Sequence, residues 1–339
     1  MNEQLSRAPL GRGGPDVSRL CLGTMMFADQ TGDDEAKRML ERYFSLGGNF
    51  VDTADSYSGG ESERMLGRLM ADKPDCFLAT KVGNPVKGVE GSGGLTPDWI
   101  AKGAAMSLER LKRDHIDLYY LHLDDNRTPL DETIGALGDL LNAGHIRHWG
   151  FSNFRAWKIA EMVRVADRLG VARPLACQPY YHMLNRAAEA ETLPACAHFG
   201  IGTVTYSPLG RGVLTGKYRN GTPEASRGAR QDKRFMETEF RPETLESARR
   251  AADHAEASHR EPVHLAINWL LANTAVTSVL MGPKSLSQLD AYLGSPASSY
   301  SAADETFLNT LCASGHTPAP GHSDPRYPFQ GRQTAFAEA

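Results

Sequence analysis

Four residues of complementary chemistry each lie at or just after the end of a short apolar run. Asp52 ends one run and is followed five residues later by Tyr57, Lys81 lies near the end of a second run, and His122 ends a third. A phenol has a pKa near ~10, which an ammonium within hydrogen-bond reach lowers by roughly one to three units. An acid could keep that buried lysine charged, and a histidine could hold a substrate oxygen. Together the four residue types could deliver a proton to a carbonyl oxygen.

The apolar runs have the length and composition of buried strands. Several are apolar at successive positions, as in IDLYYLH, which is typical of parallel strands buried on both faces. Segments with helical spacing lie between them, and residues 187–199 are assigned as a helix mainly from their place in the alternation. Strands alternating with helices predict a (β/α)8 TIM barrel, with residues 1–339 forming a single domain. The expected strands are 20–24, 49–53, 77–82, 116–122, 146–152, 174–178, 203–207 and 277–281.

Three segments fall outside this repeat. The first residues contain GRGGPD and could form a hairpin that closes the bottom of the barrel. Residues 210–261 are too long for a simple connection between the last two strands. They hold a basic loop from Arg227 to Arg234 and an extra alanine-rich helix around 245–257. The tail after Leu311 is rich in Pro, Gly and His, has no period, and is a functional or disordered segment by its composition.

The strand ends define the expected site, because catalytic residues of barrel enzymes lie at the carboxyl ends of the strands. A single Asp or Tyr there has a plain structural explanation, since Asp52 could cap a turn and Tyr57 could cover a surface. An Asp, a Tyr, a Lys and a His on one rim favour catalysis instead. The other strand ends supply Gly23, Thr24, Met25, Ser152, Asn153, Gln178, Tyr206, Ser207, Gly282 and Lys284.

A proton donor beside a carbonyl oxygen fits reduction if a hydride reaches the carbonyl carbon, and nicotinamide supplies hydride. The glycine-containing stretch YSPLGRGVLTGKY at 206–218 follows the seventh strand. A Rossmann fingerprint would instead open a βαβ unit, so we interpret this stretch as backbone amides and Lys217 around a pyrophosphate. MGPKSLSQLDAY at 281–292 begins a helix whose amide donors favour a phosphate, and Lys284 favours NADPH over NADH.

The sequence resembles the aldo-keto reductase superfamily over roughly residues 20 to 295. The resemblance is carried by VDTADSYSGGESE at 51–63, ATKVG around Lys81, IDLYYLHLDD at 116–125, GHIRHWGFSNF at 144–154, Gln178, and the two stretches just described. It implies an (α/β)8 barrel that reduces aldehydes or ketones with NADPH, or oxidises alcohols in reverse. It also implies a catalytic tetrad in which Tyr57 is the proton donor, formed by Asp52, Tyr57, Lys81 and His122.

The resemblance further assigns the cofactor contacts. Ser152, Asn153 and Gln178 match positions that hold the nicotinamide amide, and Tyr206 matches the position that stacks on the ring. The residues expected to bind NADP(H) are Gly23, Thr24, Met25, Asp52, Ser152, Asn153, Gln178, Tyr206, Ser207, Pro208, Leu209, Arg211, Gly212, Leu214, Lys217, Gly282, Lys284 and Gln288.

Composition narrows the partners and the location. A net charge of −4 gives no reason to expect nucleic acid or an anionic membrane. Five scattered cysteines without CxxC suggest buried reduced thiols, and no cluster has the spacing of metal ligands. The N-terminus lacks an apolar signal core and no apolar run could span a membrane, so we expect a cytoplasmic protein. The expected partner is a small carbonyl or alcohol substrate, and the oligomeric state stays open.

Two other functions remain as hypotheses. Barrels resembling this one also serve as accessory subunits of potassium channels, so a cofactor-sensing regulatory subunit is the first. An unrelated TIM-barrel hydrolase is the second, and its activity would survive both Tyr57→Phe and cofactor removal.

Overall fold

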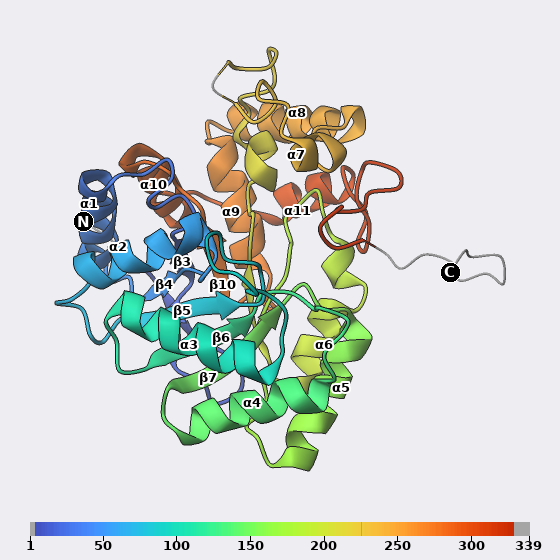
Figure 1. The fold of residues 1–339 in the computed structure, drawn as a ribbon. Helices are drawn as coiled ribbons and strands as arrows, with labels where there is room; N and C mark the ends of the chain where they lie inside the picture. Colours follow the sequence, from blue (N-terminus) through green and yellow to red (C-terminus); the bar gives the residue numbers. More distant parts are fainter. Residues whose placement is uncertain (1–3, 225, 329–339) are drawn as a thin grey trace.

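A computed structural model describes residues 4–224 and 226–328, and its centre is a closed barrel of eight parallel strands (Figure 1). Around the barrel the strands follow the order β10-β3-β4-β5-β6-β7-β8-β9, so each strand pairs with its neighbours in sequence and the last closes onto the first. The predicted (β/α)8 architecture is confirmed. The strands are β3 (Leu20–Gly23), β4 (Phe50–Asp52), β5 (Phe77–Val82), β6 (Ile116–Leu121), β7 (Ile146–Ser152), β8 (Ala176–Gln178), β9 (Gly202–Thr205) and β10 (Ser278–Met281).

Strand β6 shows why the apolar runs are continuous. Leu118 and Tyr120 pack inside the barrel with Phe50, whereas Tyr119 and Leu121 pack outward against the helix layer. Because successive side chains of a strand point to opposite faces, a strand covered on both faces is apolar at most positions. The exception in β6 is Asp117, which is partly exposed and accepts a hydrogen bond from the Leu78 amide at 3.0 Å.

The helices lie outside the barrel. They are α1 (Asp33–Ser45), α2 (Glu61–Leu69), α3 (Pro97–Leu111), α4 (Leu130–Asn142), α5 (Ala156–Leu169), α6 (Thr192–Phe199), α8 (Pro242–Ala257), α9 (Pro262–Ala272) and α10 (Leu286–Leu293). Helix α3 begins as its sequence predicts. The Thr96 side chain accepts a hydrogen bond from the Trp99 amide at 3.4 Å, and Pro97 occupies the first turn.

The hairpin predicted at the start of the chain is present. Strands β1 (Arg7–Pro9) and β2 (Asp16–Ser18) pair antiparallel, and Leu10 at their turn is fully buried in the inner cluster. The Arg12 amide donates to the Gly200 carbonyl at 2.7 Å, just before β9 begins. The hairpin therefore closes the amino-terminal end of the barrel, opposite the predicted site.

The structure differs from the sequence prediction in three helical segments. The helix expected over 187–199 is broken into a short 3-10 turn, Ala187–Glu189, and α6, which begins at Thr192. This segment has no continuous apolar stripe to hold a single helix. Two helices were not predicted: α7 (Lys233–Glu237), inside the long connection after β9, and α11 (Ala302–Asn309), which begins with a capping box formed by Ser301 and Asp304. The extra alanine-rich helix is confirmed as α8.

All five cysteines are buried and free, as their spacing suggested. Within residues 4–224 and 226–328, no helix combines the length and the apolar character that a bilayer crossing requires.

Candidate active site

Strand register brings the predicted acid, lysine and histidine together. Asp52 pairs with Ala79, which is two residues before Lys81, and Lys81 pairs with Tyr120, which is two residues before His122. Residues two apart on a strand point to the same face, so the side chains rise in steps around the inner rim. The stagger is the shear that a closed barrel of tilted strands requires.

Lys81 is the centre of the cluster. Its ammonium donates hydrogen bonds to the Asp52 carboxylate, to the Thr53 carbonyl at 2.6 Å and to the Tyr57 phenol oxygen at 3.4 Å. The side chains of Lys81 and Asp52 are buried, whereas Tyr57 and His122 are partly exposed at the mouth of the barrel. Because Lys81 donates to the phenol oxygen, the phenol hydrogen is not used in this contact. The structure thus brings the predicted tetrad together.

Tyr57 is held by a tight loop whose glycines have a clear physical reason. It begins a 3-10 turn, Tyr57–Gly60, in which Gly60 has a φ of 96°. A side chain at Gly60 would meet the guanidinium of Arg110 at 2.5 Å. Arg110 in turn donates to the Glu63 carboxylate at 3.1 Å and to the Asp55 carbonyl at 3.3 Å. Gly60 therefore lets the turn that carries Tyr57 lie directly against a buried ion pair.

Burial changes the acid strength of Tyr57 more than the lysine does. Burial raises the pKa of Tyr57, the Lys81 charge lowers it, and the net result is a raised pKa. The lowered pKa expected from the sequence is therefore wrong for this structure, because desolvation of the phenolate outweighs the nearby ammonium. At neutral pH the phenol keeps its proton.

Lys81 is positively charged at neutral pH, whereas His122 is neutral. Burial works against the ammonium, but the charges and hydrogen bonds of Asp52 and Tyr57 leave the pKa of Lys81 raised. Burial, followed by the Lys81 charge, lowers the pKa of His122 well below its usual range, so its imidazole is neutral at pH 7. The Nδ1 atom of His122 is buried and has no hydrogen-bond partner among the described residues. The ring of His122 lies edge-on to the ring of Tyr57, with centroids 6.0 Å apart.

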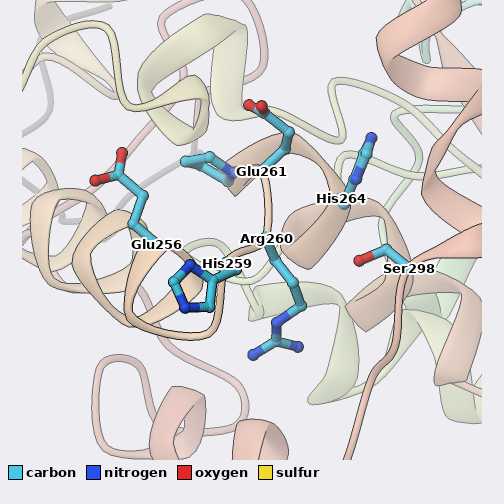
Figure 2. Close-up of a pocket in the computed structure, with 7 residues that line it drawn as sticks. Glu256, His259, Arg260, Glu261, His264 and Ser298 are labelled. Atoms are coloured by element: carbon cyan, nitrogen blue, oxygen red, sulfur yellow. The ribbon is translucent and has the colours of Figure 1, made fainter.

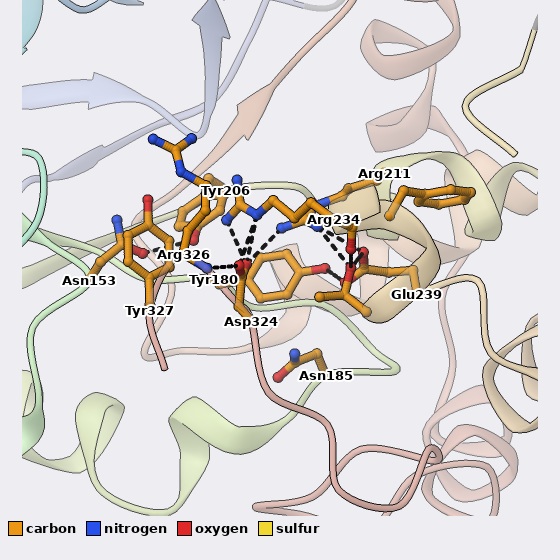
Figure 3. A network of polar contacts seen from close by, with 12 residues as sticks. Asn153, Tyr180, Asn185, Tyr206, Arg211, Arg234, Glu239, Asp324, Arg326 and Tyr327 are labelled. Carbon is orange, nitrogen blue, oxygen red and sulfur yellow. Dashed lines mark hydrogen bonds and ion pairs between the residues drawn. The ribbon is translucent and has the colours of Figure 1, made fainter. Parts of the chain in front are cut away.

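The residues predicted to hold a nicotinamide amide form the neighbouring wall. The Gln178 amide donates to Asp52 at 2.9 Å, and the Ser152 hydroxyl donates to the Gln178 carbonyl at 2.7 Å. Asn153 has a φ of 61°, donates to the His122 carbonyl at 2.8 Å and accepts from the Tyr206 hydroxyl at 2.8 Å. Tyr206 is partly exposed beside Asn153, as a platform for a flat ring requires (Figure 3).

The loop after β9, which the sequence predicts to hold a pyrophosphate, has a tight and irregular backbone. The turn Gly210–Thr215 is kinked, with left-handed backbone at Arg211 and at Gly212, whose φ is 104°. Pro208, Leu209 and Leu214 are buried, so they support the loop from below. The pKa of Lys217 is lowered by desolvation of its ammonium and by repulsion from Arg227, Lys284 and Arg230. Four cations this close together fit a polyanionic group such as the phosphates of a dinucleotide.

In the second segment predicted to bind a phosphate, residues 281–292, one helix amide is already bonded to an acidic side chain. Ser285 caps α10 by accepting from the Gln288 amide at 3.4 Å, and the Gln288 side chain accepts from the Lys284 amide at 3.0 Å. The Leu286 amide, however, already donates to the carboxylate of Glu35 from α1 at 2.6 Å. The Leu286 amide, which the sequence predicts to bind a phosphate, is therefore bonded to Glu35 instead.

The remaining predicted residues lie on the same rim. Gly23 pairs with Asp52 in the sheet, and the Thr24 hydroxyl donates to the Asp52 carbonyl at 3.0 Å. Met25 is 43% exposed, which suits a contact with a ligand, and Gly282 has open space where a side chain would begin. The side chain of Arg211 instead pairs with Glu239 and with Asp324, at 3.2 and 2.9 Å.

Several residues at the mouth escaped the sequence prediction. Tyr180 lies two residues beyond Gln178, so the strand-end rule could have found it. Its ring lies 5.2 Å from that of Tyr206, and its hydroxyl donates to Glu239. Asp324, Arg326 and Tyr327 come from the tail, where no period points to any element (Figure 3).

A separate cavity lies away from this rim. It has a volume of about 450 Å³ and is lined by Glu256, His259, Arg260, Glu261, Pro262, His264 and Ser298, where α8 meets α9 (Figure 2). Glu256, His259 and Glu261 are exposed, and no group of three or more possible metal ligands occurs in the described part of the chain.

Comparisons with known proteins agree with the family resemblance seen in the sequence. A family model described as the aldo/keto reductase family matches residues 19–306. A rice (Oryza sativa subsp. japonica) protein named "Probable voltage-gated potassium channel subunit beta" is 34% identical over 288 residues, covering 83% of this chain and 88% of the rice protein. An Arabidopsis thaliana protein of the same name is 34% identical over 290 residues, covering 83% and 88%. The "Uncharacterized oxidoreductase YrpG" of Bacillus subtilis is 33% identical over 295 residues, covering 83% and 87%.

Proposed function

The chain belongs to the aldo/keto reductase family, and from that premise we propose that it reduces an aldehyde or a ketone to an alcohol, or catalyses the reverse oxidation, with Tyr57 as proton donor. The observation that carries the proposal is the contact of the buried Lys81 ammonium with both Asp52 and the Tyr57 phenol oxygen. Packing residues would not need a buried charge aimed at a partly exposed phenol.

Each side chain has a definite part in this chemistry. A bound nicotinamide supplies or accepts the hydride. Tyr57 donates its proton to the substrate oxygen as negative charge develops there, and Lys81 stabilises the phenolate that remains. Asp52 keeps Lys81 charged, and the neutral His122 offers a ring nitrogen to the substrate oxygen. Ser152, Asn153 and Gln178 orient the nicotinamide amide, and Tyr206 supports its ring.

The cofactor in this proposal is NADP(H). The cation cluster of Lys217, Arg227, Arg230 and Lys284 supports this choice, because a 2′-phosphate adds negative charge that NAD(H) lacks. Glu35, bonded to the Leu286 amide, acts in the opposite direction.

The test is NADPH consumption by the purified protein with a panel of aldehydes, ketones and dicarbonyls. We expect wild type to turn over and Tyr57→Phe to lose about 10²- to 10⁴-fold in kcat while still binding NADPH. Tyr300→Phe is the matched control, because this phenol bonds Glu305 at the start of α11, away from the strand ends. Full activity in Tyr57→Phe would refute the assigned proton donor.

A second candidate function follows from the rice and Arabidopsis relatives, both named as probable potassium channel subunits. On this proposal the chain binds the dinucleotide tightly and reports its redox state to a voltage-gated potassium channel. Co-expression of this chain with a voltage-gated potassium channel, followed by purification of the channel, tests this second function. A stable complex combined with negligible turnover would favour this function over the first.

A further inference from the structure

The tail, as far as residue 328, contacts several strand-end loops at the mouth of the barrel. Asp324 pairs with Arg211, which follows β9, and with Arg234 in the connection that leads to β10. Two residues later, Arg326 donates from Nη2 to Oδ1 of Asn84 at 3.0 Å. Asn84 is buried and lies three residues after Lys81. The tail thus places Arg326 beside the loop of the strand that carries the central lysine of the tetrad.

Several other charges at this mouth are paired. Arg211 and Arg234 face Glu239 and Asp324, and Lys81 faces Asp52. The two acids that follow His122 are also engaged: Asp124 pairs with Lys158, and Asp125 accepts from the Leu95 amide at 2.8 Å. Arg326, by contrast, forms no ion pair with any carboxylate of residues 4–224 and 226–328.

Arg326 is also directed away from the carboxylate beside it in the chain. Figure 3 shows its guanidinium pointing away from Asp324, which is bonded by Arg211 and Arg234. Arg326 is exposed, and its contact with Asn84 uses one of the five N–H groups of the guanidinium. A second edge of the planar group remains available to bind a carboxylate with two parallel hydrogen bonds.

Its position relative to the tetrad completes the argument. Tyr327, the next residue, lies near the phenols of Tyr57 and Tyr206, whose pKa values are raised by burial first and in part by Tyr327. The positive charge of Arg326 also contributes to the lowered pKa of His122, after burial and Lys81. An anion bound to Arg326 would therefore lie at the same barrel mouth as a carbonyl group held by Tyr57 and His122.

We propose that Arg326 is the residue that recognises the substrate's charge, and that the preferred substrates are aldehydes or ketones carrying a carboxylate. This inference rests on the proposed reductase function and adds the substrate class to it. Arg326 binds the carboxylate, Asn84 orients the guanidinium, and Asp324 holds the tail in place by its two arginines.

The experiment compares three oxo-acids with uncharged aldehydes of equal chain length, using NADPH and the full chain at low ionic strength. The pairs are 4-oxobutanoate with butanal, 5-oxopentanoate with pentanal, and 6-oxohexanoate with hexanal. We expect kcat/KM of wild type to favour the acid by roughly 10- to 150-fold in at least one pair, the range for hydrogen bonds to a charged group. In Arg326→Gln this ratio should fall to near one, mainly through KM of the acid. Arg326→Lys should fall between, because it keeps the charge and loses the fork.

Arg249→Gln is the matched control, since it removes the same charge from an exposed arginine of α8 that pairs with Glu246 and Asp253. Its ratio should equal that of wild type. A wild type that prefers the uncharged aldehyde in every pair, or an Arg326→Gln variant that keeps the wild-type ratio, would overturn the inference while leaving the reductase function intact.

Absence of turnover with every aldehyde would instead count against the proposed function. The inference then has its own readout, the calorimetric affinity of 4-hydroxybutanoate for the NADP-loaded protein. Weaker binding to Arg326→Gln than to wild type supports it. Equal binding to both, or no binding to wild type, overturns it.

Discussion

Asp52→Asn is the substitution that tests the central ion pair most directly. Asparagine has nearly the same size and can still accept from Gln178, which donates to Asp52 at 2.9 Å. It removes the negative charge that faces Lys81, whose side chain is 0% exposed. The ammonium keeps only the Thr53 carbonyl and the Tyr57 oxygen, at 2.6 and 3.4 Å.

The expected loss follows from the burial of this pair. Removing one partner of a buried ion pair costs about 3–5 kcal/mol, because the other charge stays buried without compensation. For a chain of 339 residues the unfolding entropy is roughly 0.7 kcal/mol per kelvin, so Tm should fall by roughly 4–7 °C at pH 7. The double variant Asp52→Asn/Lys81→Met should recover most of that loss, because a methionine at 81 leaves no buried charge.

The loss should also depend on pH, with a definite sign. In wild type the pKa of Lys81 is raised, so its contribution is complete below about pH 10.4 and is lost only above it. In Asp52→Asn the lysine pKa should be depressed. The unfolded state then binds more protons, and the free energy of unfolding should rise with pH by up to ~1.4 kcal/mol per unit. Urea unfolding from pH 7 to 9, followed by circular dichroism, measures this slope.

Three results would refute this reasoning. The first is a single variant as stable as wild type to within about 1 kcal/mol, which would mean that Lys81 does not depend on Asp52 for its charge. The second is a double variant whose loss equals the sum of the two single losses, which would show that the residues are energetically independent. The third is an Asp52→Asn variant whose free energy of unfolding changes with pH no more steeply than that of wild type.

Two further predictions follow from the charge states and from the phosphate segment. The pKa of Tyr57 is raised and that of His122 is lowered, so kcat/KM for reduction should be constant from pH 6 to 9. The rate of the reverse oxidation should rise with pH, because that reaction needs the phenolate of Tyr57. A bell-shaped profile centred near pH 7 for reduction would contradict both pKa assignments. Glu35→Gln should increase the preference for NADPH over NADH by about 3- to 10-fold, because it removes a carboxylate bonded to the Leu286 amide beside Lys284. The measurement is the Kd of each cofactor by fluorescence, with Glu61→Gln, an exposed acid on α2, as the control.

The sequence was sufficient to predict the barrel and the tetrad for one reason. Strand ends are local features, and the shear of a closed barrel converts them into one rim. Asp52, Lys81 and His122 could therefore be grouped without any knowledge of their contacts. The direction of the Tyr57 pKa shift could not be obtained in this way, because the opposing effects of burial and Lys81 depend on how tightly the loop packs.

The tail could not be predicted for a different reason. Its contacts depend on single side chains that meet others far away in the sequence, such as Arg326 with Asn84 and Asp324 with Arg211. No periodicity marks such pairs. Glu35 was missed for the same reason, since its contact with the α10 amide joins residues 251 positions apart.

The two ends of the barrel also differ in when their contacts can form. The hairpin at residues 7–18 closes one end, whereas the mouth needs a contact between Asn84 and Arg326 that closes a loop of 242 residues. Contacts of high sequence separation pay a large loop-closure entropy before they contribute any stability. Closure of the barrel between β3 and β10 joins residues such as Leu20 and Val279, which are 259 positions apart, so loop length does not separate the barrel from the tail. The order of synthesis does separate them, because the last barrel strand ends at Met281 and Arg326 is added later. During synthesis, the barrel and its proton donor can therefore be in place before the wall that selects the substrate. Substrate selectivity would be the last property this chain acquires as it folds.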